Sequence, residues 1–239
     1  MFGYLSTKEI NRTIYKANVF GVRDYPFQVI KPSTNVKLGK WVSKSRHAGK
    51  RMYTVTLEER ATCPKTCKHW YDCYGNTMPF AHRIKYDKHL IRKMDKELAY
   101  LNTKKYGVLI RLHVLGDFPD LKYVEHWEQW LDKYENISCY GYTAHSPKES
   151  IGGRIAIMNE QRWDRWSIRF SNYPRYKLSA NSDVVSKNGI TCPEQAGQTK
   201  SCGTCGLCWN KSTKRILFMT HSRDLRKGKN DKTSNQLSQ

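Results

Sequence analysis

The sequence has 239 residues but no apolar run of about 18 residues or more, so it predicts no membrane-spanning helix. Its first residues, MFGYLSTKEINRTIYK, lack the apolar core and the small-residue cleavage site of a secretory signal. We therefore expect a cytoplasmic protein with no membrane contact. The composition is not that of a disordered chain either, since 38% of the residues are hydrophobic and 12% are aromatic.

Acidic residues are scarce. The chain has 21 Asp and Glu against 42 Lys and Arg, which gives a formal net charge of +21. The excess is uneven, because residues 1–56 carry 11 basic residues against 2 acidic ones, whereas residues 107–172 carry 8 against 9. An excess of this size is typical of proteins that bind a polyanion, most often nucleic acid. Its alternative role is to aid solubility alone.

The segment VKLGKWVSKSRHAGKR, residues 36–51, contains six Lys and Arg, no acidic residue and one Trp. Cations in such a segment can contact phosphates, and the aromatic ring can stack on a base. The segment therefore predicts a nucleic-acid interface, with a solvated loop as the alternative. The residues of this predicted interface are Lys37, Lys40, Trp41, Lys44, Arg46, Lys50 and Arg51.

Apolar runs alternate with amphipathic stretches in the middle of the chain. The runs predict strands over 52–57, 107–115, 137–143, 165–171 and 214–221, and the amphipathic stretches predict helices over 82–102, 120–135 and 148–162. This alternation predicts an α/β fold, as a partial (βα) barrel or an open, mostly parallel sheet, with a Cys-rich metal-binding C-terminal segment. The expected organisation is a basic N-terminal extension (1–51), an α/β core with a cysteine loop (52–171), a Cys-rich segment with the last strand (172–221) and a polar basic tail (222–239).

Eight cysteines in a chain without a secretory signal indicate metal or redox chemistry rather than disulfides. Cys63, Cys67 and Cys73 lie in one short loop after the first predicted strand. Three thiolates can hold three irons of a [4Fe–4S] cluster and leave the fourth iron open to a small molecule. They can also bind zinc with His69 as a fourth ligand, or remain free thiols.

A second group of cysteines lies near the C-terminus. Its members are Cys192, Cys202, Cys205 and Cys208, and two residues separate each of the last three. Four thiolates close a site, as structural zinc or as a second [4Fe–4S] cluster, and this spacing favours iron–sulfur. Cys139 stands alone inside a predicted strand and is expected to be a buried apolar residue.

A strand, a three-cysteine loop and a later strand that ends in Gly116-Asp117 resemble the radical S-adenosylmethionine (SAM) enzymes. The usual loop of those enzymes has two residues in its second gap, where this chain has five. More closely, the chain resembles the phage "gene product eighty-eight" family. The similar stretches are 35–40 (NVKLGK), 62–74, 111–113 (RLH), 116–118 (GDF), 142–143, 167–169 (SIR), 192–195 (CPEQ) and 202–209 (CGTCGLCW).

The resemblance implies one or two [4Fe–4S] clusters, SAM, an external electron donor and, for a phage protein, the host cytoplasm. Cys63, Cys67 and Cys73 would each bind one iron, and the fourth iron would chelate SAM, whose reductive cleavage releases a 5′-deoxyadenosyl radical. The implied SAM or substrate contacts are Gly116, Asp117 through the SAM ammonium, Arg169 through the SAM carboxylate, Thr143 and Ser171.

The residues alone leave simpler roles open. Asp117 can cap the helix predicted from 120, Arg169 can pair with an acid, and His113 on an apolar strand is typical of a core residue. Two functions follow: a radical-SAM-like iron–sulfur enzyme that acts on nucleic acid or nucleotides, or a non-catalytic nucleic-acid-binding protein stabilised by two Cys-rich metal sites.

Overall fold

The chain adopts a mixed α/β fold in a computed structural model that describes residues 11–171, 173, 175–176, 179–181, 189–213 and 215–219. Within these residues, the main sheet has eight strands in the order β2-β3-β5-β6-β7-β8-β10-β9, and only β2 is antiparallel to its neighbour. The two edge strands do not pair with each other, so the mostly parallel sheet is open. Its strands are β2 (Lys31–Pro32), β3 (Arg51–Thr54), β5 (Val108–Leu112), β6 (Ile137–Thr143), β7 (Trp166–Ser171), β8 (Ser179–Asn181), β9 (Ile190–Thr191) and β10 (Arg215–Leu217).

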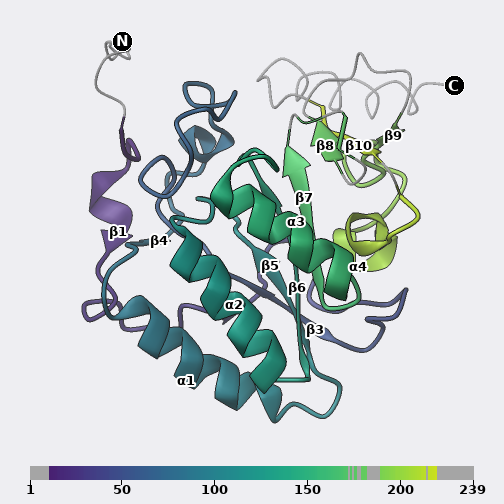
Figure 1. Ribbon diagram of the computed structural model, residues 1–239, viewed down its shortest axis with the longest axis horizontal. Helices are drawn as coiled ribbons and strands as arrows, with labels where there is room; N and C mark the ends of the chain where they lie inside the picture. Colours follow the sequence, from purple (N-terminus) through teal and green to yellow (C-terminus); the bar gives the residue numbers. More distant parts are fainter. Residues whose placement is uncertain are drawn as a thin grey trace, which may run out of the picture.

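Three helices cover one face of this sheet (Figure 1). They are α1 (Leu90–Asn102), α2 (Leu121–Lys133) and α3 (Ser150–Arg162). Trp127 of α2 and Trp166 of β7 are fully buried between them, with ring centroids 6.3 Å apart. The apolar stripes of the helices therefore form one core with the strand residues that point to this side.

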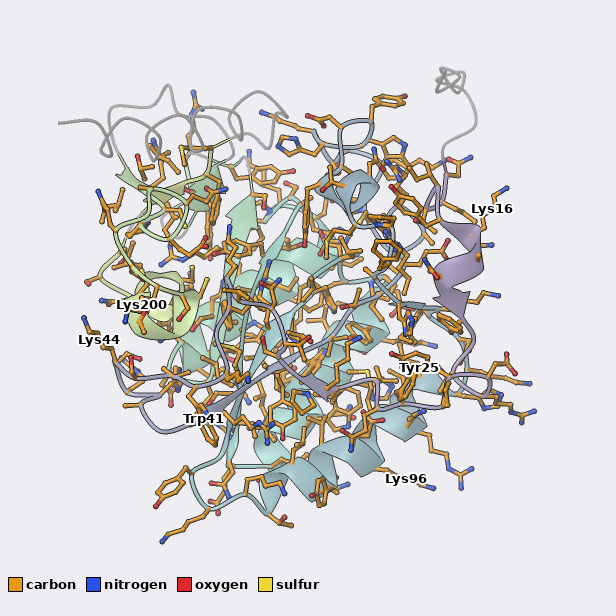
Figure 2. All side chains as sticks on the ribbon, turned by 180° about the vertical axis from the view of Figure 1, so that it is seen from behind. Lys16, Tyr25, Trp41, Lys44, Lys96 and Lys200 are labelled. Atoms are coloured by element: carbon orange, nitrogen blue, oxygen red, sulfur yellow. The ribbon has the colours of Figure 1, made fainter. Side chains whose placement is uncertain are left out.

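Irregular segments cover the opposite face of the sheet, and Figure 2 shows the molecule from this side. Met52, Leu109 and Tyr140 point to this side, because successive residues of a strand alternate between the faces. They pack against Leu38 and Val42 of the N-terminal part and against the C-terminal cysteine segment. That segment contains α4 (Cys202–Cys205) and the 3₁₀ turn η3 (Leu207–Trp209).

The N-terminal residues are part of the packed body. Val22, Tyr25, Val29 and Ile30 are buried in the helix-side core, although sequence analysis set residues 1–51 apart as an extension. The short 3₁₀ turn η1 (Lys16–Asn18) precedes β1 (Val19–Phe20), which pairs in parallel with β4 (Arg83–Ile84). Residues 1–10 of the expected extension and the whole expected tail, 222–239, lie outside the described residues.

The predicted elements of the α/β core are present with adjusted ends. The predicted strand over 137–143 is observed as β6 with those bounds, and the predicted helices over 120–135 and 148–162 are observed as α2 and α3. The helix predicted over 82–102 begins at Leu90 instead, because Arg83 and Ile84 pair as a strand. No helix in the described ranges is both long and apolar enough to span a bilayer.

Two buried histidines make stability depend on pH. Burial lowers the pKa of His47 to about 4 and the pKa of His113 to about 3, so both are neutral in the folded chain near neutral pH. In the unfolded chain each titrates near the usual value of about 6.5. Below that pH the unfolded chain therefore binds protons that the folded chain does not, and the free energy of unfolding falls as pH falls.

We expect this loss to be about 1.4 kcal/mol per pH unit for each histidine between about pH 6.5 and 4.5. Urea unfolding at several pH values measures it. His47→Gln should flatten the dependence by about half of the histidine contribution, and an unchanged slope in this variant would contradict the assignment.

Candidate functional site

The three cysteines of the first loop lie around one cavity. The cavity has a volume of about 480 Å³ and opens at the carboxyl ends of β5, β6 and β7. Cys63, Cys67 and Cys73 all line it, and each is partly exposed. The carboxyl edge of a parallel sheet is where such folds place ligands.

The same cavity contains most of the residues expected to contact SAM. Gly116, Asp117, Thr143 and Ser171 line it together with the three cysteines. Gly116 follows β5 with a positive φ of 82°, and a Cβ there would lie 2.6 Å from the Thr62 hydroxyl. Only glycine therefore allows the strand to turn so close to the cysteine loop.

Asp117 joins the ends of two neighbouring strands. Its carboxylate accepts hydrogen bonds from the Phe118 N–H (2.8 Å), the Thr143 hydroxyl (2.8 Å) and the Ala144 N–H (2.7 Å). Burial raises the pKa of Asp117, and His145 together with these donors opposes the rise. The carboxylate can accept about four hydrogen bonds, so these contacts leave about one position for a ligand.

Asp117 is not the cap of the following helix. Asp120 is the N-cap of α2, and its carboxylate accepts from the Tyr123 N–H (2.8 Å) and the Tyr86 hydroxyl (2.8 Å). The capping alternative considered for Asp117 is therefore wrong. Both residues precede the helix, but only the residue directly before its first turn can reach the free N–H groups.

Arg169 does not line the cavity that was expected to hold SAM. The residue is fully buried, and its guanidinium donates to the carbonyls of Cys208 (2.8 Å), Thr213 (2.9 Å) and Asn210 (3.0 Å). It thus holds the C-terminal cysteine segment against β7. The structure therefore places Arg169 at the rear cysteine group and not in the cavity where the contact with the SAM carboxylate was expected.

The cysteine loop is closed at its base by a buried ion pair. Arg83 Nε donates to Glu59 Oε2 at 2.7 Å, and both side chains are at most 1% exposed. The remaining N–H groups of Arg83 donate to the carbonyls of Gly75 (3.1 Å), Met78 (3.2 Å) and Ala81 (2.6 Å). One guanidinium therefore fixes both ends of the loop and its last turns, which include the 3₁₀ turn η2 (Tyr74–Thr77).

The two neighbours of Glu59 also hold this loop. Glu58 accepts two hydrogen bonds from Arg12 (2.8 and 2.6 Å). Arg60, with a positive φ of 64°, donates to the Trp70 carbonyl and the Asn76 side chain, both at 2.8 Å. Sequence analysis did not predict that Glu58, Glu59 and Arg60 hold the loop. Three charged residues directly after a buried strand are an unusual pattern that could have indicated this role.

Burial favours the protonated form of the three thiols of the first loop, and nearby backbone groups favour the thiolate form. Burial raises the pKa of Cys67 to about 11 and raises the pKa values of Cys63 and Cys73, while backbone hydrogen bonds to all three sulfurs oppose the rise. Metal binding removes such protons. His69 Nδ1 contacts the Asp72 carboxylate at 3.1 Å, which is also how a ligating histidine is commonly oriented.

The second cysteine group lies on the rear face of the sheet. Cys192, Cys202 and Cys208 line a cavity of about 300 Å³, and burial together with the nearby Cys192 raises the pKa of Cys205. The Tyr142 hydroxyl donates to Cys208 Sγ at 2.7 Å. Tyr140 also lines this cavity, and its buried hydroxyl has no hydrogen-bond partner among the described residues. Within the described part of the chain, this hydroxyl is therefore available to donate to a group in the cavity.

The donor sets fit iron–sulfur clusters or zinc in their chemistry. Soft thiolate sulfur is the ligand type that both prefer, and the unpartnered Tyr140 hydroxyl fits a negatively charged group beside the second set. In the described part of the chain, no group of three or more His, Cys, Asp or Glu side chains is arranged so that it could hold a metal ion.

Only some side chains of the basic segment 36–51 are free to contact another molecule, because others bind within the protein. Lys37 pairs with Glu194 (3.2 Å), and Lys50 donates to the Ser138 hydroxyl (2.8 Å). The segment also holds the second cysteine group, since the Cys202 N–H donates to the Lys37 carbonyl at 2.8 Å. The residues of the predicted interface that remain exposed are Lys40, Trp41, Lys44, Arg46 and Arg51.

Comparisons of the chain with protein-family models, with curated proteins and with solved structures found no match.

We expect Arg83→Met to lower the free energy of unfolding by about 3–5 kcal/mol, because it leaves the buried Glu59 carboxylate without its cation. Urea unfolding measures this loss, and thiol alkylation of the folded protein reports the opening of the loop. Lys133→Ala is the control, since Lys133 is 58% exposed, its partner Asp95 is 38% exposed and such a surface pair contributes little. Equal losses in both variants would contradict the proposed role of Arg83.

Proposed function

We propose that the protein is an iron–sulfur enzyme similar to radical SAM enzymes that acts on nucleic acid or nucleotides. The observation that carries this proposal is that Cys63, Cys67 and Cys73 share one open cavity with Asp117 at the carboxyl edge of the sheet. A volume of about 480 Å³ suits a ligand of the size of SAM.

The proposed roles follow the geometry. Cys63, Cys67 and Cys73 would hold three irons of a [4Fe–4S] cluster, and a reduced cluster of this kind supplies the electron that cleaves a carbon–sulfur bond of SAM. Asp117 would accept a hydrogen bond from the SAM ammonium at its remaining acceptor position. Thr143 positions Asp117 through its 2.8 Å hydrogen bond, and Gly116 brings the turn close to the loop. An external donor would supply the electron.

The second cysteine group would hold an auxiliary [4Fe–4S] cluster or a zinc ion. Its thiols come from α4, from η3 and from Cys192 directly after β9, and the Tyr142 hydroxyl donates to Cys208 while Tyr140 lines the same cavity. Hydrogen bonds of this kind stabilise anionic sulfur ligands. Because Arg169 and the basic segment hold the same turns, a bound metal here would also stabilise the rear face of the sheet.

The second candidate function is a nucleic-acid-binding protein without catalysis, stabilised by two metal sites. The contact between His69 and Asp72 favours it, because a histidine oriented in this way could complete a closed zinc site with the three loop cysteines. The discriminating property is whether the first site binds a small molecule.

We expect reduced, cluster-loaded protein to bind SAM and to cleave it slowly to 5′-deoxyadenosine. Asp117→Asn should weaken SAM binding by about 10- to 100-fold, the cost of losing a charge-assisted hydrogen bond, and should leave the iron content unchanged. Cys67→Ala should lose iron. Calorimetry with SAM and an absorbance spectrum measure these effects.

Asp120→Ala is the matched control for Asp117→Asn. It removes the N-cap of α2 and should lower stability by about 1 kcal/mol while SAM binding is retained. If fully loaded wild-type protein binds no SAM, the enzyme proposal is wrong and the non-catalytic candidate is favoured.

We expect Cys205→Ala to lose the metal of the second group and to retain that of the first. Cys139→Ala is the control, because Cys139 is buried in β6 and its loss should lower stability without changing the metal content. Iron and zinc analysis of the purified variants measures both. Unchanged metal content in Cys205→Ala would remove this residue from the ligand set.

A further inference from the structure

A third cavity lies beside the amino ends of β3 and β5, at the edge of the sheet opposite the cavity of the first cysteine loop. Its volume is about 370 Å³, and residues from the basic segment, from the end of α1 and from the loop before β5 line it. The cysteine cavity is lined by residues at the other ends of these strands. The two cavities are therefore separate sites.

Aromatic rings that are open to solvent surround this cavity. Trp41 is 56% exposed, Tyr100 is 54% exposed and Tyr106 is 65% exposed, although each of these side chains is large and mostly apolar. Three such rings around one cavity form an apolar surface that is open to solvent. Figure 2 shows Trp41 on the rear face, away from the helices α2 and α3.

A cation accompanies each ring. The Arg51 guanidinium lies 5.7 Å from the centre of the Trp41 ring, the Lys104 ammonium lies 4.1 Å from that of Tyr100 and the Lys105 ammonium lies 5.4 Å from that of Tyr106. None of the residues that line this cavity in the described chain is Asp or Glu. This surface therefore fits a ligand that has a flat aromatic ring and, next to the ring, a negatively charged group.

We infer that this cavity, lined by Trp41, Arg51, Tyr100, Lys104, Lys105 and Tyr106, binds an unpaired base of single-stranded nucleic acid together with its neighbouring phosphates. Exposed rings stack on bases of any sequence, and the adjacent cations track the backbone. A duplex hides the faces of its bases, so it cannot use the rings in this way. The exposed Lys40, Lys44 and Arg46 extend the positive surface along the basic segment.

This inference makes the nucleic-acid part of the proposed function more specific and is independent of the clusters and of SAM. It also adds four residues, Tyr100, Lys104, Lys105 and Tyr106, that sequence analysis did not connect with Trp41. The fold brings them together because β3 and β5 are hydrogen-bonded neighbours, with Arg51 opposite Val108.

Fluorescence anisotropy with a fluorescein-labelled 12-nucleotide oligo(dT) tests the inference on the full chain. We expect Trp41→Ala and Tyr106→Ala each to weaken binding about ten-fold, as truncation of a base-stacking ring does. Lys105→Ala should flatten the slope of log K against log salt by about 0.7, whereas Lys96→Ala, an exposed lysine earlier on α1, should leave it unchanged. Oligo(U) and a duplex of equal length, used as competitors, distinguish RNA and double strands from single-stranded DNA.

Phe80→Ala is the control for ring truncation, because Phe80 is 91% exposed and belongs to the cysteine loop at the other edge. If this variant loses affinity while Trp41→Ala retains it, the strand binds over the cysteine loop and the inference is wrong. Equal competition by the duplex would also overturn it. A protein that binds the strand through Trp41 but binds no SAM would refute the proposed enzyme and leave this inference intact, whereas the reverse result would refute only the inference.

Discussion

The first cysteine loop depends on the buried ion pair between Arg83 and Glu59. Removing both charges from water costs several kcal/mol per ion, so the pair is favourable only with further hydrogen bonds. The carbonyls of Gly75, Met78 and Ala81 provide them, and all three belong to the loop. The same hydrogen bonds therefore stabilise the buried guanidinium and fix the conformation of the loop. This explains how a loop with little regular structure can hold Cys63, Cys67 and Cys73 around a cavity.

The parallel sheet places different chemistry at its two edges. At the carboxyl edge, thiols and the buried carboxylate of Asp117 surround a cavity, and this set suits soft metals and a ligand ammonium. At the amino edge, exposed rings and cations surround another cavity, and this set suits bases and phosphates. The basic segment links the sheet to the rear cysteine group, since Trp41 lies at the amino edge while Lys37 and Ser43 hydrogen-bond to α4. A Cβ on Gly203 of α4 would lie 2.2 Å from the Trp41 carbonyl, so this contact requires glycine.

Sequence periodicity was sufficient to predict the helices and strands whose side chains only pack in the core. The strand at 137–143 and the helix from 121 follow from apolar patterns because burial alone decides them. Positions decided by one long-range contact were not predictable in this way. Arg83 was expected in a helix but pairs across the cysteine loop. Arg169 has the alternation of a strand residue that points to the rear face, where carbonyls of a distant segment accept hydrogen bonds from it. The residues of the cysteine cavity were predictable to the extent that parallel strands end at one edge, whereas the aromatic cavity joins segments with no common motif.

The cavities of the two cysteine groups share part of one wall. The Tyr142 ring lines both cavities, and its hydroxyl donates to Cys208 at the rear group. The Arg111 guanidinium also lines both cavities and lies 4.4 Å from the centre of this ring. The positive charge of Arg111 lowers the pKa values of Cys202 and Cys208 against the effect of burial, whereas the charge of Arg60 does so for Cys73. The two cysteine groups thus share Tyr142 and Arg111 in their walls, but different cations favour their thiolate forms.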